Sequence, residues 1–225
     1  MTVVQARIEA VVFDMDGVLI DSEVIWRRVR ETYAAEIGHT WTEADQLALM
    51  GCSTQDWSVR MRERLGIVHL SGQALADEII GRVLAAFRQE LPVRPGAAQA
   101  LHALGERWPL ALASGSPRVL VACAMELTGF GRHFRSVLCG DDVSQGKPHP
   151  EIYLRSLERL GVDARAAAGV EDSANGLRAL RAAGMWAIAA PCPEFPLPPD
   201  ARALAHAEVA DLHGVTPELV TGLVR

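Results

Sequence analysis

The stretch that decides the fold reads Ile8-Glu9-Ala10-Val11-Val12-Phe13, followed by Asp14-Met15-Asp16-Gly17-Val18-Leu19-Ile20-Asp21-Ser22-Glu23. Its first part has the length and the β-branched character of a buried strand. The carboxylates of Asp14 and Asp16 therefore follow the C-terminal end of a strand, where open α/β sheets bind their ligands. Gly17 lets the backbone turn tightly beside them. Two acids this close cannot share a compact site without a cation or a proton to offset their repulsion, so the stretch predicts a metal and acid–base site.

The composition is that of an ordinary soluble globular protein. Hydrophobic residues make up 49% and charged residues 22% of a 225-residue chain, which is long enough for one large domain or two smaller ones. The net charge of −6 provides no basic surface for a nucleic acid, which we exclude as a partner. No apolar run approaches the ~20 residues that cross a bilayer, so a membrane is excluded as well.

Location and assembly are predicted from similar features. The charged residues Arg7, Glu9 and Asp14 are wrong for a signal peptide, which predicts a cytoplasmic protein. The four cysteines show no paired spacing, and we expect them to be reduced and mostly buried. They are Cys52, Cys123, Cys139 and Cys192. Nothing in the sequence indicates an exposed hydrophobic stripe, so we expect a monomer.

The chain after the first strand has a helical pattern. Ser22 is positioned to cap the first of these helices. Thr42 and Ser53 each have an aspartate three residues later, which is a variant of the capping box at helix starts. A longer helix is predicted over residues 71–90, before Pro92-Val93-Arg94-Pro95-Gly96 interrupts the pattern as a hinge would.

Beyond this break, strands and helices alternate. Short apolar strands are predicted over residues 109–113, 136–139, 167–170 and 185–190. The helices between them have clear ends, such as Ser116-Pro117 at a start and Gly161 at an end. Such alternation predicts a parallel sheet with right-handed crossovers. We therefore predict an α/β core of residues 1–18 and 92–225, with an inserted all-helical cap domain of residues 19–91 above the first strand.

A hydroxyl group at the end of the second predicted strand is placed to bind phosphate. In Leu112-Ala113-Ser114-Gly115-Ser116-Pro117, the hydroxyl of Ser114 is followed by Gly115 and the start of a helix. Such a hydroxyl and the nearby backbone N–H groups are well suited to bind a phosphate. Taken alone, however, the pattern fits a helix cap better than a phosphate site.

Lys147 is the only lysine in the chain, since 21 of the 22 basic residues are arginines. It stands in Gln145-Gly146-Lys147-Pro148-His149-Pro150. An ammonium group is a compact point charge, whereas a guanidinium is a broad planar fork. A site between a phosphate and carboxylates could admit the first and not the second. The alternative is that one lysine survived by chance.

Two more acids follow the strand predicted at residues 167–170. They stand in Val170-Glu171-Asp172-Ser173-Ala174-Asn175-Gly176. Adjacent acids at a helix start could simply favour the helix dipole. Their position after a strand is nevertheless the same as that of Asp14 and Asp16.

These four segments, in this order, resemble the four motifs of the haloacid dehalogenase-like (HAD-like) phosphohydrolase superfamily. The first motif of that family is D-x-D-G-[TV]-[LI]-x-D-[ST], and the second is a Ser or Thr at the end of a strand. The third matches Gly146-Lys147-Pro148-His149-Pro150, and the fourth matches the acids Glu171 and Asp172. The resemblance implies a Rossmann-like parallel-sheet core with an inserted helical cap, and an activity on phosphate esters.

The resemblance also implies catalytic roles. Asp14 would attack the phosphorus of a phosphomonoester and form an aspartyl-phosphate, while Asp16 would protonate the leaving alkoxide and later deprotonate water. Lys147 would neutralise the phosphoryl group and the nucleophile. Ser114 and Gly115 would bind the phosphoryl oxygens.

Mg²⁺ is the cofactor that the resemblance implies, since hard cations prefer oxygen ligands. The candidate metal ligands are Asp14, Asp16, Asp172 and Glu171. Asp172 is the one expected to bind the metal directly. Glu171 is expected to reach it through water or to support the ligands from outside.

The motifs are most similar to those of bacterial sugar and hexitol phosphatases, including the 2-deoxyglucose-6-phosphate phosphatase type. Asp16 disfavours dehalogenases and phosphonate hydrolases, which lack this acid. The β-phosphoglucomutase branch is the main alternative, but it has His where this chain has Trp26. Its cap also carries Lys and Arg where Met50 and Thr54 stand. Without those cations the cap lacks a clamp for a second phosphate, so a mutase is disfavoured.

The predicted function is therefore that of a Mg²⁺-dependent phosphomonoesterase acting on sugar or sugar-alcohol phosphates. Its partner is a small-molecule phosphomonoester substrate. Met50 and Thr54 are predicted to line the pocket, and Trp26 to stack on a sugar or to pack the cap against the core. A non-catalytic protein that binds phosphometabolites is a further alternative, although such a protein would be expected to lack one of the four motifs.

Overall fold

The computed structural model describes residues 7–50 and 52–224. Residues 1–6, 51 and 225, which fall within the predicted domains, lie outside the described part of the chain. The elements follow in the order β1 (Ala10–Phe13), α1 (Glu23–Glu36), α2 (Glu43–Leu49), α3 (Thr54–Arg64), α4 (Gly72–Gln89), α5 (Ala97–Gly105), β2 (Leu110–Ala113), α6 (Arg118–Thr128), η1 (Phe130–His133), β3 (Phe134–Leu138), η2 (Gly140–Asp142), α7 (Glu151–Leu160), η3 (Ala164–Ala166), β4 (Ala167–Glu171), α8 (Ala174–Ala183), β5 (Trp186–Ala189), α9 (Pro199–Arg202), β6 (Ala207–Glu208), η4 (Leu212–Gly214) and α10 (Pro217–Gly222).

The first strand lies in the middle of a parallel sheet. Across the described residues, six strands form one sheet in the order β3-β2-β1-β4-β5-β6. In β1, Val12 stands opposite Ala111 of β2 and Gly169 of β4. The parallel α/β core expected from the sequence is confirmed. The short strand β6, which pairs with β5, was not predicted because two residues are too few to show a periodic pattern.

The sheet is buried on both faces, which explains its continuous apolar strands. On one face, Val11 and Phe13 pack in the same cluster as Leu101 of α5. On the other face, Val12 packs in a second cluster with Leu180 of α8. Because successive side chains of a strand point to opposite faces, β1 contributes to both clusters and is fixed in place by both.

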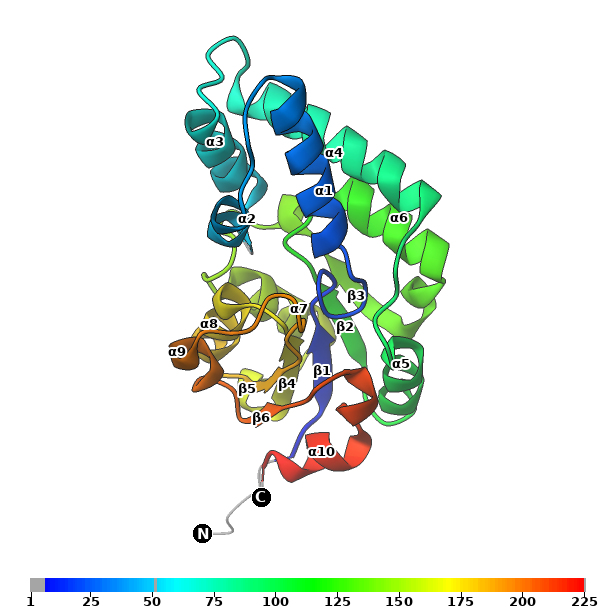
Figure 1. Ribbon diagram of the computed structural model, residues 1–225. Helices are drawn as coiled ribbons and strands as arrows, with labels where there is room; N and C mark the ends of the chain where they lie inside the picture. The colour runs from blue at the N-terminus through cyan, green and yellow to red at the C-terminus, as the bar shows by residue number, and fades with distance from the viewer. Residues whose placement is uncertain (1–6, 51, 225) are drawn as a thin grey trace.

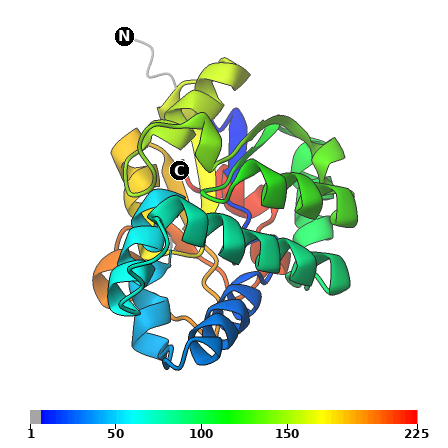
Figure 2. The ribbon, with the colours of Figure 1, turned by 90° about the horizontal axis from the view of Figure 1, so that it is seen from above.

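Helices α1 to α4 lie above the carboxyl ends of the strands, as Figure 1 shows. Seen from above, α4 lies beside α6 of the core (Figure 2), and the two helices are in contact. The inserted helical layer is therefore placed over the end of β1, where Asp14 leaves the sheet. The proposed division at residues 18/19 and 91/92 stays a prediction. Within the described residues, no helix combines the length and the apolar character needed to cross a membrane.

The two connections between the sheet and the helical layer run side by side. The backbone N–H of Asp21 donates to the carbonyl of Pro92 at 2.9 Å, and that of Arg94 donates to the carbonyl of Leu19 at 3.0 Å. An isolated antiparallel bridge joins the same two segments. A movement of the helical layer would therefore bend both connections together.

Two of the predicted helix caps are confirmed and two are wrong. The side chains of Thr42 and Ser53 accept hydrogen bonds from the first turns of α2 and α3. Ser22 precedes α1 but its side chain caps nothing, and Pro117 rather than Ser116 occupies the cap position of α6. The hydroxyls of Ser22 and Ser116 donate to Asp16 instead. A charge-assisted hydrogen bond to a carboxylate is stronger than one with a neutral backbone group, so the carboxylate determines where both hydroxyls point.

Candidate active site

Asp14 is held at the end of β1 by the strand beside it. Its backbone N–H donates to the carbonyl of Val170 in β4 at 3.1 Å, and the residue is 5% exposed. Gly17, which follows in the turn, has a φ of 75°. A Cβ atom at this position would lie 1.9 Å from Oδ2 of Asp172. Only glycine therefore allows the turn that brings the loops after β1 and β4 together.

Lys147 lies between two carboxylates at the centre of the site. Its Nζ donates to Oδ1 of Asp14 at 2.7 Å and to Oε1 of Glu171 at 2.6 Å, and its side chain is 6% exposed. The hydroxyl of Tyr153 donates to the same Glu171 oxygen at 2.5 Å, and Nζ lies 5.0 Å from the centre of the Tyr153 ring. Burial alone would lower the pKa of Lys147, but Asp14 and Glu171 raise it well above its usual value. The ammonium group therefore stays charged.

The surroundings of Asp14 favour its neutral form, in contrast to those of Lys147. Burial, with smaller contributions from the nearby acids Glu171 and Asp16, raises the pKa of Asp14 to about 8 against the lowering effect of Lys147. Burial, followed by Glu171 and Asp14, also raises the pKa of Asp172 well above its usual value. One lysine does not offset the negative charge gathered at this edge of the sheet.

Asp16 is fixed by three hydroxyl groups. Ser22 donates to its Oδ1 at 2.7 Å, while Ser114 and Ser116 each donate to its Oδ2 at 2.9 Å. The backbone N–H of Ser116 in turn donates to the hydroxyl of Ser114 at 3.0 Å. Ser114, predicted to bind phosphate, is fully buried, whereas Gly115 and Ser116 line the cavity in front of Asp14.

Three of the four candidate metal ligands form a compact group. Asp14, Glu171 and Asp172 each offer one carboxylate oxygen, and these atoms lie within 4.8 Å of one another. The carboxylate of Asp16 is not a member of this group among the described residues. Both oxygens of Glu171 already accept hydrogen bonds, Oε1 from the Lys147 and Tyr153 side chains and Oε2 from the residues after it.

Asp172 has a different environment from Glu171. It is 6% exposed, and no hydrogen bond to its carboxylate is formed within residues 7–50 and 52–224. A buried carboxylate without a donor is costly, and an oxygen-binding divalent cation would compensate it. The three carboxylate oxygens are therefore suitable ligands for Mg²⁺. Asp172 is a better candidate for a direct ligand than Glu171, whose oxygens already accept hydrogen bonds.

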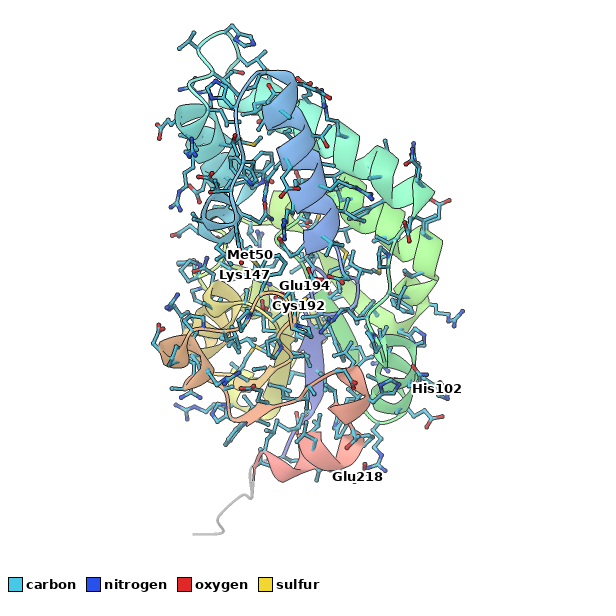
Figure 3. The ribbon with its side chains drawn as sticks, in the orientation of Figure 1. Met50, His102, Lys147, Cys192, Glu194 and Glu218 are labelled. Atoms are coloured by element: carbon cyan, nitrogen blue, oxygen red, sulfur yellow. The ribbon has the colours of Figure 1, made fainter. Side chains whose placement is uncertain are left out.

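The helical layer closes the site from above. A cavity of about 70 Å³ lies in front of Asp14, and Trp26, Met50 and Thr54 all line it. Met50 and Lys147 stand at the junction of the helical layer and the sheet in Figure 3. Trp26 is 5% exposed and packs edge-on against Trp57, with ring centres 5.7 Å apart. The cavity adjoins a larger groove between the helical layer and the core, which shares Thr54 and Lys147 with it.

Several residues of the site were missed by sequence reasoning. They are Ser22, Ser116, Tyr153, Glu23, Arg30, Gln46 and Trp57. Arg30 follows Trp26 by four residues in a predicted helix, so a shared helix face could have indicated it. Tyr153 and Gln46 gave no comparable signal, because their partners are distant in the sequence.

Comparison with known proteins decides the family. The family described as haloacid dehalogenase-like hydrolase matches residues 8–184, which is more than half of the chain. The chain belongs to this family. Hexitol phosphatase B of Escherichia coli K12 is 30% identical over 194 residues, covering 84% of this chain and 86% of that protein. The phosphorylated carbohydrates phosphatase of Thermotoga maritima is 34% identical over 185 residues, covering 80% and 83%.

A solved structure of this type is similar in fold. CbbY from Rhodobacter sphaeroides in complex with phosphate superimposes with a TM-score of 0.80 at 27% identity, covering 91% of this chain and 95% of that one. The HAD-like resemblance found in the sequence is thus confirmed, and the protein is a phosphatase-type enzyme of this family. The individual roles predicted for Asp14, Asp16, Ser114 and Lys147 stay predictions.

Proposed function

We propose that this HAD-like hydrolase is a Mg²⁺-dependent phosphomonoesterase that acts on sugar or sugar-alcohol phosphates through an aspartyl-phosphate. The observation that carries the proposal is the contact of Asp14 with Lys147. A carboxylate whose oxygen lies 2.7 Å from a buried ammonium is prepared for the approach of a second anion, because the ammonium offsets their repulsion. The similarity to hexitol and phosphorylated-carbohydrate phosphatases supports the substrate class.

In the proposed first step, an oxygen of Asp14 attacks phosphorus in line and the bond to the leaving alkoxide breaks. Lys147 holds the incoming phosphoryl oxygens against Asp14, and Gly115 offers a backbone N–H from the turn after β2. Bound Mg²⁺, held by Asp14 and Asp172, would supply further positive charge to the phosphoryl group. Closure of the helical layer keeps water out during this step.

Asp16 is the proposed proton carrier. It gives its proton to the leaving alkoxide in the first step and takes one from the attacking water in the second. The hydroxyls of Ser22, Ser114 and Ser116, at 2.7 to 2.9 Å, hold the Asp16 carboxyl in one orientation. Such support from two separate segments, the turn before α1 and the loop after β2, keeps the carboxyl in one place.

The cavity in front of Asp14 is by itself too small for the body of a hexose phosphate. Its volume of about 70 Å³ holds only a few water molecules, each of which needs roughly 10–15 Å³ by this measure. We therefore infer that the helical layer moves away from the sheet to admit substrate and release product. The paired connections at residues 19–21 and 92–94 are the segments that would bend.

The test of this proposal is release of inorganic phosphate from a panel of sugar and sugar-alcohol phosphates, with Mg²⁺ and with EDTA. We expect metal-dependent release from hexose or hexitol monophosphates. Glucose 1-phosphate is followed in the same plate for conversion to glucose 6-phosphate. Turnover that is unchanged by EDTA, or absent from every phosphomonoester, would contradict the proposal.

A phosphosugar mutase is the second candidate, and Arg30 is the observation that favours it. Arg30 lines the cavity from the helical layer, so a cation stands there even though Met50 and Thr54 replace the Lys and Arg of the mutase branch. Isomerisation of glucose 1-phosphate without phosphate release would support this candidate. A protein that binds phosphometabolites without turnover, the cytoplasmic location and the monomeric state stay predictions from the sequence.

We expect Mg²⁺ to stabilise the protein more at high pH than at low pH. The raised pKa of Asp14, about 8, and that of Asp172 mean that the metal-free folded state binds more protons than the unfolded chain. In EDTA the free energy of unfolding should therefore fall as pH rises from 5 to about 8. Mg²⁺ binds the ionised carboxylates, so it should remove most of that fall.

The measurement is thermal unfolding from pH 5 to 8 with Mg²⁺ and with EDTA. At pH 8 we expect Mg²⁺ to raise Tm by about 4–8 °C, which corresponds to about 2 kcal/mol for a chain of this size. Asp172→Asn should abolish most of the increase. A matched exposed variant, Asp200→Asn, should keep it. An equal Mg²⁺ effect at both ends of the pH range would show that these carboxylates do not bind the metal.

A further inference from the structure

Arg30 is an unusual residue for the interior of a helical layer. It lies on α1, is 4% exposed, and lines the cavity in front of Asp14. Its guanidinium carbon lies 4.8 Å from the ring centre of Trp26 and 5.2 Å from that of Trp57. Its Nε atom is buried and has no hydrogen-bond partner among the described residues. Such a group costs free energy unless something binds to it.

Gln46 connects Arg30 to a half-buried acid, Glu23. Nη1 of Arg30 donates to Oε1 of Gln46 at 3.1 Å, and Nε2 of Gln46 donates to Oε2 of Glu23 at 3.0 Å. The indole N–H of Trp41 donates to the same Gln46 oxygen at 3.2 Å. Three hydrogen bonds therefore fix the orientation of Gln46, which is fully buried.

Glu23 and Arg30 line the same cavity without forming a direct ion pair within the described residues. A buried base and a half-buried acid that face the same cavity normally pair with each other. Here the amide of Gln46 holds them apart, so that each keeps hydrogen-bonding capacity for a third group. Burial raises the pKa of Glu23 to about 6, with Arg30 opposing the rise, and burial lowers the pKa of Arg30 to about 10.

We propose that Arg30 and Glu23, fixed by Gln46, form a subsite that binds hydroxyl groups on the body of the phosphomonoester. The guanidinium donates to a hydroxyl oxygen, and the Glu23 carboxylate accepts from a hydroxyl hydrogen. The rings of Trp26 and Trp57, over which the guanidinium lies, hold Arg30 in place beside the cavity. This subsite rests on the proposed function, because it places the phosphate at Asp14 and the polyol toward the helical layer.

The charges of the subsite favour a neutral polyol over a second phosphate. Arg30 and Glu23 carry opposite charges, so this wall of the cavity is neutral overall. A second phosphate dianion would gain from Arg30 and be repelled by Glu23, and it would remain next to the acids at Asp14 and Asp172. A hydroxyl group uses both side chains at once. A site built to bind hydroxyls also discriminates strongly against analogues that lack them.

The test measures affinity rather than turnover. Hexitol 6-phosphate, hexyl phosphate and fructose 1,6-bisphosphate are titrated calorimetrically with Mg²⁺ into the full-length protein carrying Asp14→Asn, so that no hydrolysis occurs. Arg30→Met and Glu23→Gln are then added singly to this background. Arg27→Met is the matched control, since Arg27 lies on the same helix but outside the cavity, with a side chain 44% exposed and paired with Glu31.

We expect Arg30→Met and Glu23→Gln each to lower the ratio of hexitol phosphate affinity to hexyl phosphate affinity by at least ~10-fold, a typical loss for a hydrogen bond to a charged group. Arg27→Met should leave the ratio unchanged. Arg30→Lys keeps the charge but lacks the Nε donor. Its affinity ratio should therefore lie between that of Arg30→Met and that of the parent protein. Thermal unfolding establishes that each variant is folded, and Glu23→Gln is nearly isosteric.

Three results would overturn the subsite. Equal losses for hexitol and hexyl phosphate would show that Arg30 only supports packing, and a larger loss for the bisphosphate would show a second phosphate site. No detectable preference of the parent protein for hexitol phosphate over hexyl phosphate would also reject it. Failure of the proposed function is seen separately, as absence of phosphate release by the protein with Asp14 intact.

Discussion

Replacing Asp14 with asparagine should reduce kcat by at least ~10⁴-fold, the scale on which enzymes lose rate when a nucleophile is removed. An amide lacks the negative charge and the nucleophilic oxygen that the proposed attack on phosphorus requires. The fold should be retained, because Asp14 is one of several buried acids in excess over the buried bases and Lys147 keeps its contact with Glu171 at 2.6 Å. Thermal stability in EDTA should therefore not fall.

Two measurements decide the role of Asp14. The first is steady-state phosphate release by Asp14→Asn and by the exposed control Asp200→Asn, which pairs with Arg178 on the surface and should turn over normally. The second is acid quenching of the unmutated protein during turnover, followed by mass spectrometry of its peptides. We expect a phosphoryl group on the peptide that contains Asp14. Full activity of Asp14→Asn in freshly purified protein, before any deamidation, would remove the assignment.

Much of the core was predictable because its signals are local. The strand before Asp14, the alternation beyond Pro92 and the glycines that end helices all depend on neighbouring residues, and the structure confirms them. The four motifs stand after strands of one parallel sheet. Their convergence at one edge therefore follows from topology alone, since the carboxyl ends of parallel strands lie on the same side.

The remaining features of the site were not predictable, because they depend on contacts that no local sequence pattern shows. Ser22 and Ser116 have the local pattern of helix caps, yet the carboxylate of Asp16 reorients both hydroxyls. In the sequence, Tyr153 occupies an apolar position of a predicted helix. Its hydroxyl, however, donates a hydrogen bond to Glu171 at 2.5 Å. In the helical layer, the hydrogen bonds of Arg30 with Gln46 join two helices. No periodicity within either helix indicates such a partner, so the substrate-facing wall was the least predictable part.

Lys147→Arg should lower kcat/KM by about 10²–10³-fold, although the charge is kept. Nζ of Lys147 lies 2.7 Å from Asp14, 2.6 Å from Glu171 and 5.0 Å from the Tyr153 ring, in a space that is almost wholly buried. A planar guanidinium is wider than an ammonium and directs its donors as a fork. It would displace Asp14 or enter the space of the phosphoryl group, and a displacement of about 1 Å is enough to reduce turnover by about 10²-fold.

Overpacking should also destabilise the fold by about 1–3 kcal/mol, so Tm is measured with kcat/KM. Lys147→Met is the matched variant, because it removes the charge without adding width. If the compact charge is what matters, both variants lose activity. Lys147→Arg loses stability through crowding, whereas Lys147→Met loses stability because Asp14 and Glu171 are left without a cation. Near-normal activity of Lys147→Arg would show that the lone lysine of this arginine-rich chain is an accident of composition. A loss would show that this position resisted replacement by arginine because three buried neighbours leave room for an ammonium and nothing larger.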